Sequence, residues 1–81
     1  MNDLIEDENY YFYYAEFSNV NLSNVDLSNS NLVYTYLVNA NLEGANLKGV
    51  NLEGANLKGV NLEGANLEGA NLNCINNKIC N

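Results

Sequence analysis

The stretch NLEGANLKGVNLEGANLKGVNLEGANLEGANL, residues 41–72, repeats every five residues, with Asn directly before each Leu and Gly two residues after it. In a straight α-helix a five-residue step turns about 140°, so the leucines would spread over every side. In a straight strand successive leucines would point to opposite faces, because side chains alternate. Neither a straight helix nor a straight strand places all the leucines on one face. We therefore expect the chain to bend once per unit, so that every Leu points to a common axis.

The bend has its own position, two residues after the centre of each unit. Earlier units carry Asn there, for example Asn19 and Asn39, and the perfect block always carries Gly. Gly and Asn are the residues that best tolerate a positive φ in a turn. Tyr34 is an exception at this position, and we expect a different turn type there. The predicted Gly corners are Gly44, Gly49, Gly54, Gly59, Gly64 and Gly69.

The central position stays apolar along the chain, and a small or β-branched residue stands two positions before it. Ile75 takes this second position at the end of the pattern. Ser30 and Thr35 are polar residues at the same position, and we expect their hydroxyls to bond to nearby backbone. The predicted core positions are Phe12, Phe17, Leu22, Leu27, Leu32, Leu37, Leu42, Leu47, Leu52, Leu57, Leu62, Leu67 and Leu72.

Units such as A-N-L-E-G, A-N-L-K-G and V-D-L-S-N resemble the pentapeptide-repeat family, whose pattern is A-(D/N)-L-x-x. The resemblance extends over residues 10–76 and implies an all-β fold, a right-handed quadrilateral β-helix. Four units would form one coil of this solenoid, giving about three coils of roughly 20 residues. Residues 1–9 are then predicted to be an N-terminal cap segment and residues 77–81 a C-terminal end segment.

Residues 20 apart should lie side by side in neighbouring coils, about 4.8 Å apart. The Asn residues before the leucines could then form ladders of side-chain amides. Lys48 would lie beside Glu68, an exposed pair of opposite charge that contributes little to stability. Glu43 would lie beside Glu63. A solvated surface explains these charges, and a small acidic strip that meets a basic partner is the alternative.

The charge balance narrows the class of partner. Ten acidic residues against three Lys give a net charge of -7, which argues against nucleic acid and anionic membranes as partners. The apolar runs are too short to span a bilayer. The acidic N-terminus lacks the features of a signal peptide, so we expect a cytoplasmic protein. Cys74 and Cys80 are expected to be reduced thiols, since two Cys without His fit neither a disulfide framework nor a zinc site.

Nothing in the sequence indicates an enzyme. The chain has no His and no Arg, and its two Cys have no cationic neighbour beyond Lys78. A tube filled with Leu leaves no ligand cavity, and the Gly residues are explained as corners, so they form no phosphate loop. We therefore expect no catalytic residue, no metal and no cofactor.

A protein-interaction scaffold is the function that the sequence favours, because large apolar residues gather on adjoining outward faces near the N-terminal end, and Tyr is typical of interfaces. Tyr13 and Tyr14 should share one face with Val33 and Tyr34 of the next coil. A Tyr-rich surface packed under the N-terminal segment explains them equally well. We expect a homodimer and an unidentified protein partner. The resemblance also implies an alternative, an acidic DNA mimic that binds a type II topoisomerase such as gyrase, although the alternating Glu and Lys argue against it. The interface candidates are Tyr11, Tyr13, Tyr14, Val33, Tyr34, Tyr36, Val38, Ile75 and Ile79.

Overall fold

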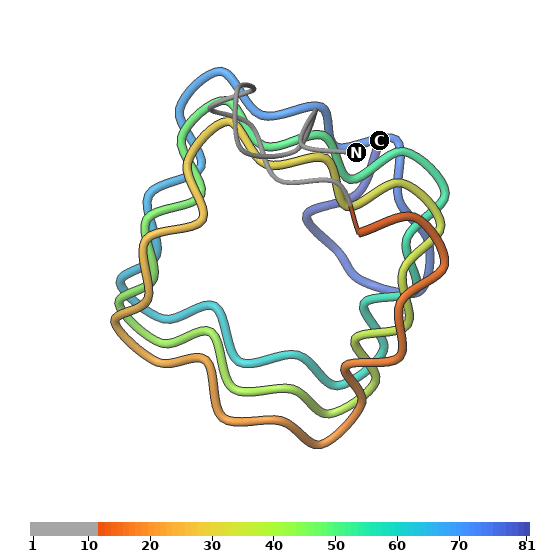
Figure 1. The fold of residues 1–81 in the computed structure, drawn as a ribbon, viewed down its shortest axis with the longest axis horizontal. Coiled ribbons are helices and arrows are strands. Elements are labelled where there is room, and N and C mark those ends of the chain that lie inside the picture. Colours follow the sequence, from red (N-terminus) through yellow and green to blue (C-terminus); the bar gives the residue numbers. More distant parts are fainter. Residues whose placement is uncertain (1–11) are drawn as a thin grey trace, which may run out of the picture.

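The structure is a computed structural model that describes residues 12–81, and it winds the chain into stacked square coils (Figure 1). The predicted N-terminal cap segment, residues 1–9, lies outside this range. Neighbouring coils are joined by parallel bridges between residues 20 apart, from Glu16–Tyr36 to Asn51–Asn71. The bridges are isolated rather than extended into longer strands, because each side of the square is a single five-residue unit. The predicted quadrilateral β-solenoid with four units per coil is confirmed.

Each side of the square ends in a β-turn, shown by the unit around Leu42. The N–H of Ala45 donates to the carbonyl of Leu42 at 3.0 Å, and Gly44 between them has φ +69°. A positive φ at the third residue is the mark of a type II turn. The Oδ1 of Asn41 accepts the N–H of Glu43 at 2.9 Å, so the Asn side chain fixes the start of the turn.

This Asx contact recurs along the solenoid and explains why Asn precedes Leu. The Oδ1 atoms of Asn46 and Asn51 accept the N–H groups of Lys48 and Glu53 in the same way. The Oδ1 atoms of these Asn side chains are therefore used within their own units. One amide pair that does join residues 20 apart is Asn76 Nδ2 to Asn56 Oδ1, at 3.1 Å.

Tyr34 forms the same corner as the other units, so the expectation of a different turn type was wrong. Its φ is +59°, and the N–H of Thr35 donates to the carbonyl of Leu32 across it. Tyr14 adopts φ +61° one coil earlier. The stacking of coils thus imposes the corner geometry even where the residue does not favour it.

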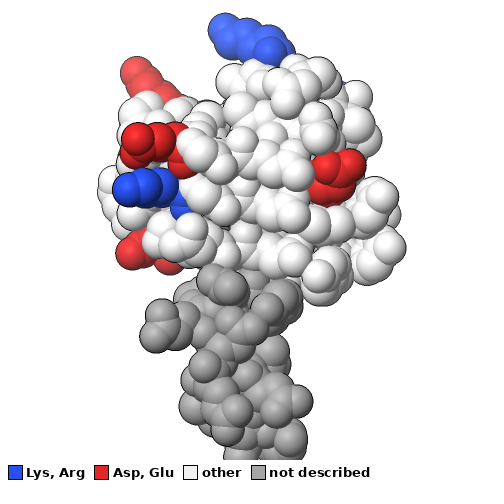
Figure 2. All heavy atoms as spheres, turned by 90° about the horizontal axis from the view of Figure 1, so that it is seen from above, with Lys and Arg blue, Asp and Glu red and all other residues white. Residues whose placement is uncertain are grey.

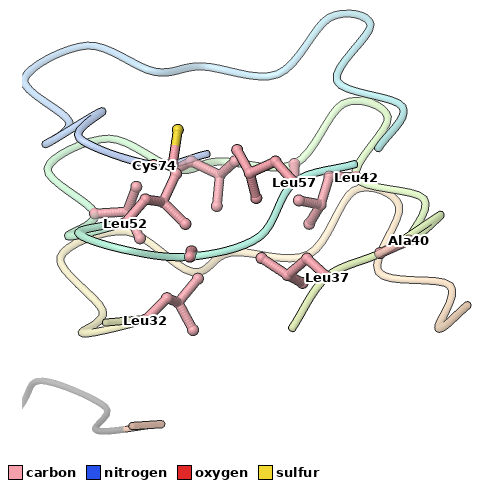
Figure 3. Packing of buried hydrophobic residues seen from close by; sticks show 11 residues of the cluster. Leu32, Leu37, Ala40, Leu42, Leu52, Leu57 and Cys74 are labelled. Carbon is pink, nitrogen blue, oxygen red and sulfur yellow. The ribbon is translucent and has the colours of Figure 1, made fainter. Parts of the chain in front are cut away.

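The core is the column of central residues inside the tube (Figure 3). Thr35 is buried there and its Oγ1 donates to the carbonyl of Leu32 at 2.8 Å, as expected. Ser30 is equally buried but its Oγ has no partner, so that expectation was wrong for Ser30. The leucines of the middle coils are at most 1% exposed: Leu32, Leu37, Leu42, Leu47, Leu52 and Leu57.

The regular register ends after Asn71. Asn56 bridges to Ile75 and not to Asn76, so the last complete side is one residue short. The shortening turns Cys74 inward, where it is 5% exposed, and turns Ile75 outward, where it is 49% exposed. The sequence placed Ile75 at the inward position, and that was wrong because the spacing changes from five residues to four.

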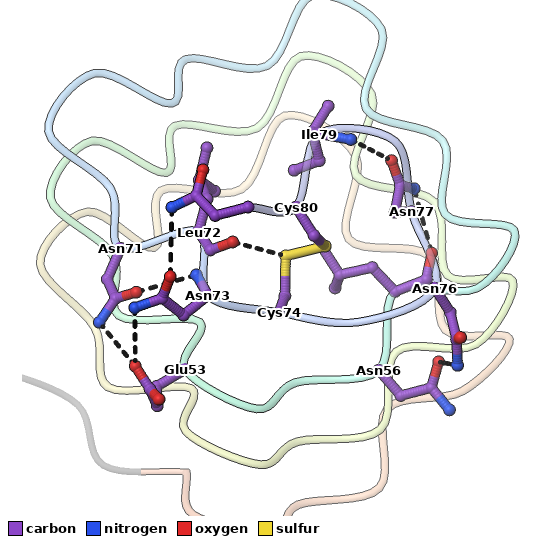
Figure 4. Close-up of a disulfide and its surroundings, with 12 residues drawn as sticks. Glu53, Asn56, Asn71, Leu72, Asn73, Cys74, Asn76, Asn77, Ile79 and Cys80 are labelled. Atoms are coloured by element: carbon purple, nitrogen blue, oxygen red, sulfur yellow. Dashed lines mark hydrogen bonds between the residues drawn. A yellow bond between two sulfur atoms is a disulfide. The ribbon is translucent and has the colours of Figure 1, made fainter.

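The two cysteines form a disulfide, so the prediction of reduced thiols was wrong. Cys74 and Cys80 are joined with their Cα atoms 5.1 Å apart (Figure 4). After Ile75 the chain leaves the path of the coils and curls back across the end of the tube (Figure 1). The N–H of Asn81 donates to the carbonyl of Leu72 at 2.8 Å. We call residues 76–81 the cap loop.

Candidate protein-interaction surface

One corner of the solenoid carries two stacked aromatic rings. The centroids of Tyr14 and Tyr34 lie 5.4 Å apart and the ring planes differ by 7°. The next corner residue in this column is Gly54, and the Tyr34 ring lies against it so closely that a Cβ on Gly54 would overlap the ring carbons. Tyr14 is 66% exposed and Tyr34 47% exposed. The stack therefore presents aromatic surface to solvent.

Further apolar side chains flank this stack on the two sides of the square that meet at the corner. Tyr13 is 52% exposed and its Oη accepts a hydrogen bond from Asn31 Nδ2 at 2.9 Å. Tyr36 is 47% exposed on the following side. Val33 and Val38 are half-buried beside these rings. We call the whole set the aromatic corner: Tyr13, Tyr14, Val33, Tyr34, Tyr36 and Val38.

The other interface candidates do not join the aromatic corner. Ile75 lies at the C-terminal end, in the same column as Tyr36 but with Asn56 between them. Ile79 is half-buried and packs against the core. Tyr11 lies outside the residues that the structure describes. The structure thus separates two exposed apolar regions, one near each end of the solenoid.

The backbone of the aromatic corner is unusual for its residue type. A left-handed φ costs a residue with a Cβ about 1–2 kcal/mol, and it is an outlier for a bulky side chain. The other three corner columns hold Asn and then Gly, which adopt this conformation readily. Stacking of the two rings offsets part of the cost, since an aromatic pair contributes about 0.5–1.5 kcal/mol. The turn alone therefore does not account for Tyr14 and Tyr34.

Sequence reasoning missed this stack, although its signal was present. Tyr14 and Tyr34 are 20 residues apart, which is the length of one coil, and both stand at the corner position. The sequence placed Tyr14 and Tyr34 on the same outward face, one coil apart, but it did not indicate that their rings stack. Placing both in one column would have predicted their contact.

Both signs of charge occur on the face of the solenoid that Figure 2 shows. Lys48 Nζ lies 3.9 Å from Glu68 Oε1, the pair expected from the spacing, and both side chains are largely exposed. Four of the ten acidic residues precede Phe12, so residues 12–81 carry six acids and three Lys, of which Lys78 lies in the cap loop. On the part of this face formed by residues 12–81, one basic group lies between acidic ones and the other charged groups stand apart among neutral residues, so the acids form no continuous track there.

Two carboxylates in the first coils replace the usual Asn of the turn. The hydroxyl of Ser28 donates to Asp26 Oδ1 at 2.7 Å and its N–H at 3.0 Å. These bonds hold the pKa of Asp26 below its ordinary value of 3.8. Hydrogen bonds from Ser18 likewise lower the pKa of Glu16 from 4.5. Both carboxylates thus stabilise the turns of their own units through hydrogen bonds from Ser.

Two further properties bear on the class of function. Among residues 12–81 there is no cluster of three or more acidic, Cys or His side chains suited to a metal ion. Over the same range the chain forms no helix with the length and apolarity needed to traverse a bilayer.

The chain is similar to solved structures of the same repeat type. A pentapeptide-repeat protein, Rfr23, from the cyanobacterium Cyanothece 51142 is 40% identical, with a TM-score of 0.77 over 83% of this chain and 47% of that one. QnrB1, a plasmid-mediated fluoroquinolone resistance protein, is 20% identical with a TM-score of 0.63 over 84% of this chain and 40% of that one. The second likeness shows the fold alone. The chain thus spans less than half the length of either structure.

No curated protein matches the chain significantly. A family profile described as pentapeptide repeats, in eight copies, matches residues 11–49 and 35–73. The resemblance predicted from the A-N-L-E-G units is therefore confirmed, and so is the right-handed quadrilateral β-helix that it implied. This chain belongs to the pentapeptide-repeat family.

Proposed function

We propose that the chain is a non-enzymatic protein-interaction scaffold that binds its partner through the aromatic corner. The observation that carries this proposal is the Tyr14–Tyr34 stack, in which two half-exposed aromatic residues occupy left-handed corners. Residues held in sparsely populated conformations without a structural need are typical of functional sites. Tyr is also enriched in protein interfaces, because it offers a large rigid surface with a polar tip.

A second copy of the chain is the partner that we propose first. The six residues of the aromatic corner carry no charge, so two copies could pair them without burying a charge. Glu16, which bridges to Tyr36, lies at the edge of this surface. A twofold dimer uses the same patch on both copies, which a compact corner on a rigid rod permits. Burial against a second copy also adds apolar contact to a chain whose own core is small.

The test compares the oligomeric mass of three proteins by sedimentation velocity. The wild type should sediment at twice its mass of 8.9 kDa. The double variant Tyr14→Asn with Tyr34→Asn should sediment as a monomer. Asn suits the corner, as at Asn19 and Asn39, so the fold should persist and its circular dichroism should match that of the wild type.

The matched control is Ile75→Asn, which removes the exposed apolar residue at the other end. Asn is the usual residue at this position of the coil, so the change suits the local structure. This variant should remain a dimer. If the double Tyr variant stays dimeric and Ile75→Asn becomes monomeric, the interface lies at the C-terminal end. A monomeric wild type would refute self-association.

The alternative, a DNA mimic that binds a type II topoisomerase, has one supporting observation, the shared fold of the resistance protein QnrB1. At 20% identity that likeness carries no binding residues. The mixed charges of the repeat region also differ from the dense negative track of a duplex. We expect no effect of the chain in a gyrase supercoiling assay at micromolar excess. Inhibition that disappears when Glu43 and Glu63 are changed to Gln would favour the mimic instead.

A further inference from the structure

We infer that the Cys74–Cys80 disulfide is a redox latch that holds the cap loop over the C-terminal end of the solenoid and releases it upon reduction. This device lies at the opposite end from the aromatic corner and does not depend on the scaffold proposal. It concerns residues 76–81, which leave the path of the coils (Figure 4).

The cap loop is weakly attached apart from the disulfide. Inside the solenoid each side is joined to the next coil by backbone bonds, such as Leu47 N–H to the carbonyl of Asn66 at 2.8 Å. Beyond Ile75, the backbone bond that ties the loop to the coils is Asn81 N–H to the carbonyl of Leu72. The remaining ties are side-chain amides: Asn76 to Asn56, Asn77 to the carbonyl of Leu57, and Asn81 to Asn73.

The loop covers apolar core that is otherwise open at this end. Leu57 is fully buried beneath it, whereas Leu62 and Leu67 of the last coil are partly exposed. Ile79 and Cys80 are the cap-loop residues that pack against the core. Release of the loop would therefore expose Leu57 and Leu72 together with unpaired strand edge, and would convert a closed end into an open one.

A reductant would have to attack from the Cys80 side of the bond, because Cys80 is the more exposed of the two residues. Cys80 is half-buried, while Cys74 is 5% exposed. A groove of about 580 Å³ runs between the loop and the last coil, and it is lined in part by Val60, Leu62 and Ile79 but by neither cysteine. The loop therefore does not pack continuously on that coil, and it can swing away without displacing the repeats.

The redox step requires an external dithiol. One thiolate of the dithiol attacks Cys80 Sγ, the S–S bond breaks, and Cys74 leaves as a thiolate that takes up a proton. The second thiol of the reagent then attacks the mixed disulfide and releases Cys80 as a thiol. The reagent leaves as a cyclic disulfide, so two electrons and two protons have passed to the protein.

The test follows amide hydrogen exchange by NMR in the folded protein with and without dithiothreitol, together with a count of free thiols. Reduction should yield two thiols and should accelerate exchange at Cys80 and Asn81 by at least about tenfold, because local opening governs their protection. The amides of Leu42 and Leu47, which are bonded within the coils, should not change. The double variant Cys74→Ala with Cys80→Ser should exchange rapidly at positions 80 and 81 and ignore the reagent.

Three outcomes would overturn the inference. Two free thiols with unchanged exchange at Asn81 would show that other contacts hold the loop. Thiols that appear only in denaturant would show that the bond is not accessible in the folded state. Equal acceleration at Asn81 and Leu47 would show that the disulfide supports the whole fold rather than one end.

Discussion

The first part of the solenoid, residues 12–40, and the repetitive part, residues 41–72, make the same corners with different residues. The first part uses Asn and Tyr, and the second uses only Gly. The corner side chains of the first part lean toward the next coil: Oδ1 of Asn24 occupies the space that a Cβ on Gly44 would need. The comparison shows that the Gly of one coil is required partly by the side chain in the coil beneath it.

The same comparison separates two reasons for Gly within the repetitive part. Gly54 lies against the ring of Tyr34, whereas Gly64 has Gly44 beneath it, and a Cβ added to Gly64 would stand 3.8 Å from the nearest atoms. Both have a positive φ, +68° and +73°. Gly54 therefore meets two constraints, a conformational and a steric one, and Gly64 meets only the conformational one.

The largest expected effect comes from breaking both constraints at once. Gly54→Ala should lower the free energy of unfolding by about 3 kcal/mol, because about 1 kcal/mol of backbone strain adds to overlap with a stacked ring. Gly64→Ala, the matched control, should cost only about 1 kcal/mol. Urea denaturation of both variants measures the difference. Equal losses would show that the stacked ring moves aside freely.

The interior of the two parts differs in polarity, which gives a second, smaller test. Ser30 is buried with an unpartnered hydroxyl, whereas the equivalent residue one coil later is Val50. Ser30→Ala should raise the free energy of unfolding by about 1 kcal/mol, because a buried hydroxyl without a partner costs about that much. Thermal or urea unfolding would measure it.

Thr35→Val is the control for Ser30→Ala. The Thr35 hydroxyl donates to the carbonyl of Leu32, so this change should lower the free energy of unfolding by about 1 kcal/mol. Opposite signs at two neighbouring interior hydroxyls are the expected result. A loss of stability in Ser30→Ala would mean that its hydroxyl is satisfied in solution.

These contrasts explain what could be predicted from the sequence. The spacing of Leu, Gly and Asn determines the bend, the corner and the inward column, because each depends on neighbours within one unit. The φ of Tyr34 could not be read from its residue type, since stacking of the coils overrides local preference. The spacing rule also misplaced Ile75, because one side has four residues, and that shift is what brings Cys74 toward Cys80.

The aromatic corner was predicted as a group of large apolar residues on adjoining outward faces, and its use as an interface stays a prediction. The sequence indicated which residues point outward but not that two rings stack over a Gly, because that contact joins three coils. The compartment also stays a prediction. Disulfides are rare in the cytosol, so the Cys74–Cys80 bond is an argument against the expected cytoplasmic location.

The smallest expected effect concerns charge in the turns of the first part. Oδ1 of Asp26 accepts the N–H of Ser28 at 3.0 Å and its hydroxyl at 2.7 Å. Oδ1 of Asn21 accepts the same two groups of Ser23 at the same distances. The turn therefore offers a charged and a neutral version of one geometry. The repetitive part uses only the neutral version, so acid should act on the turns of the first part alone.

Because folding lowers the pKa of Asp26 from 3.8, its contribution to stability is present above that value. It is lost as the pH falls below 3.8 and through the folded pKa, since the unfolded chain then binds the proton more readily. Asp26→Asn should therefore flatten the fall in thermal midpoint between about pH 5 and the acid limit, by a small amount because the group is exposed. An unchanged acid slope in Asp26→Asn would contradict this assignment, and Glu16→Gln would then test the other carboxylate whose pKa is lowered.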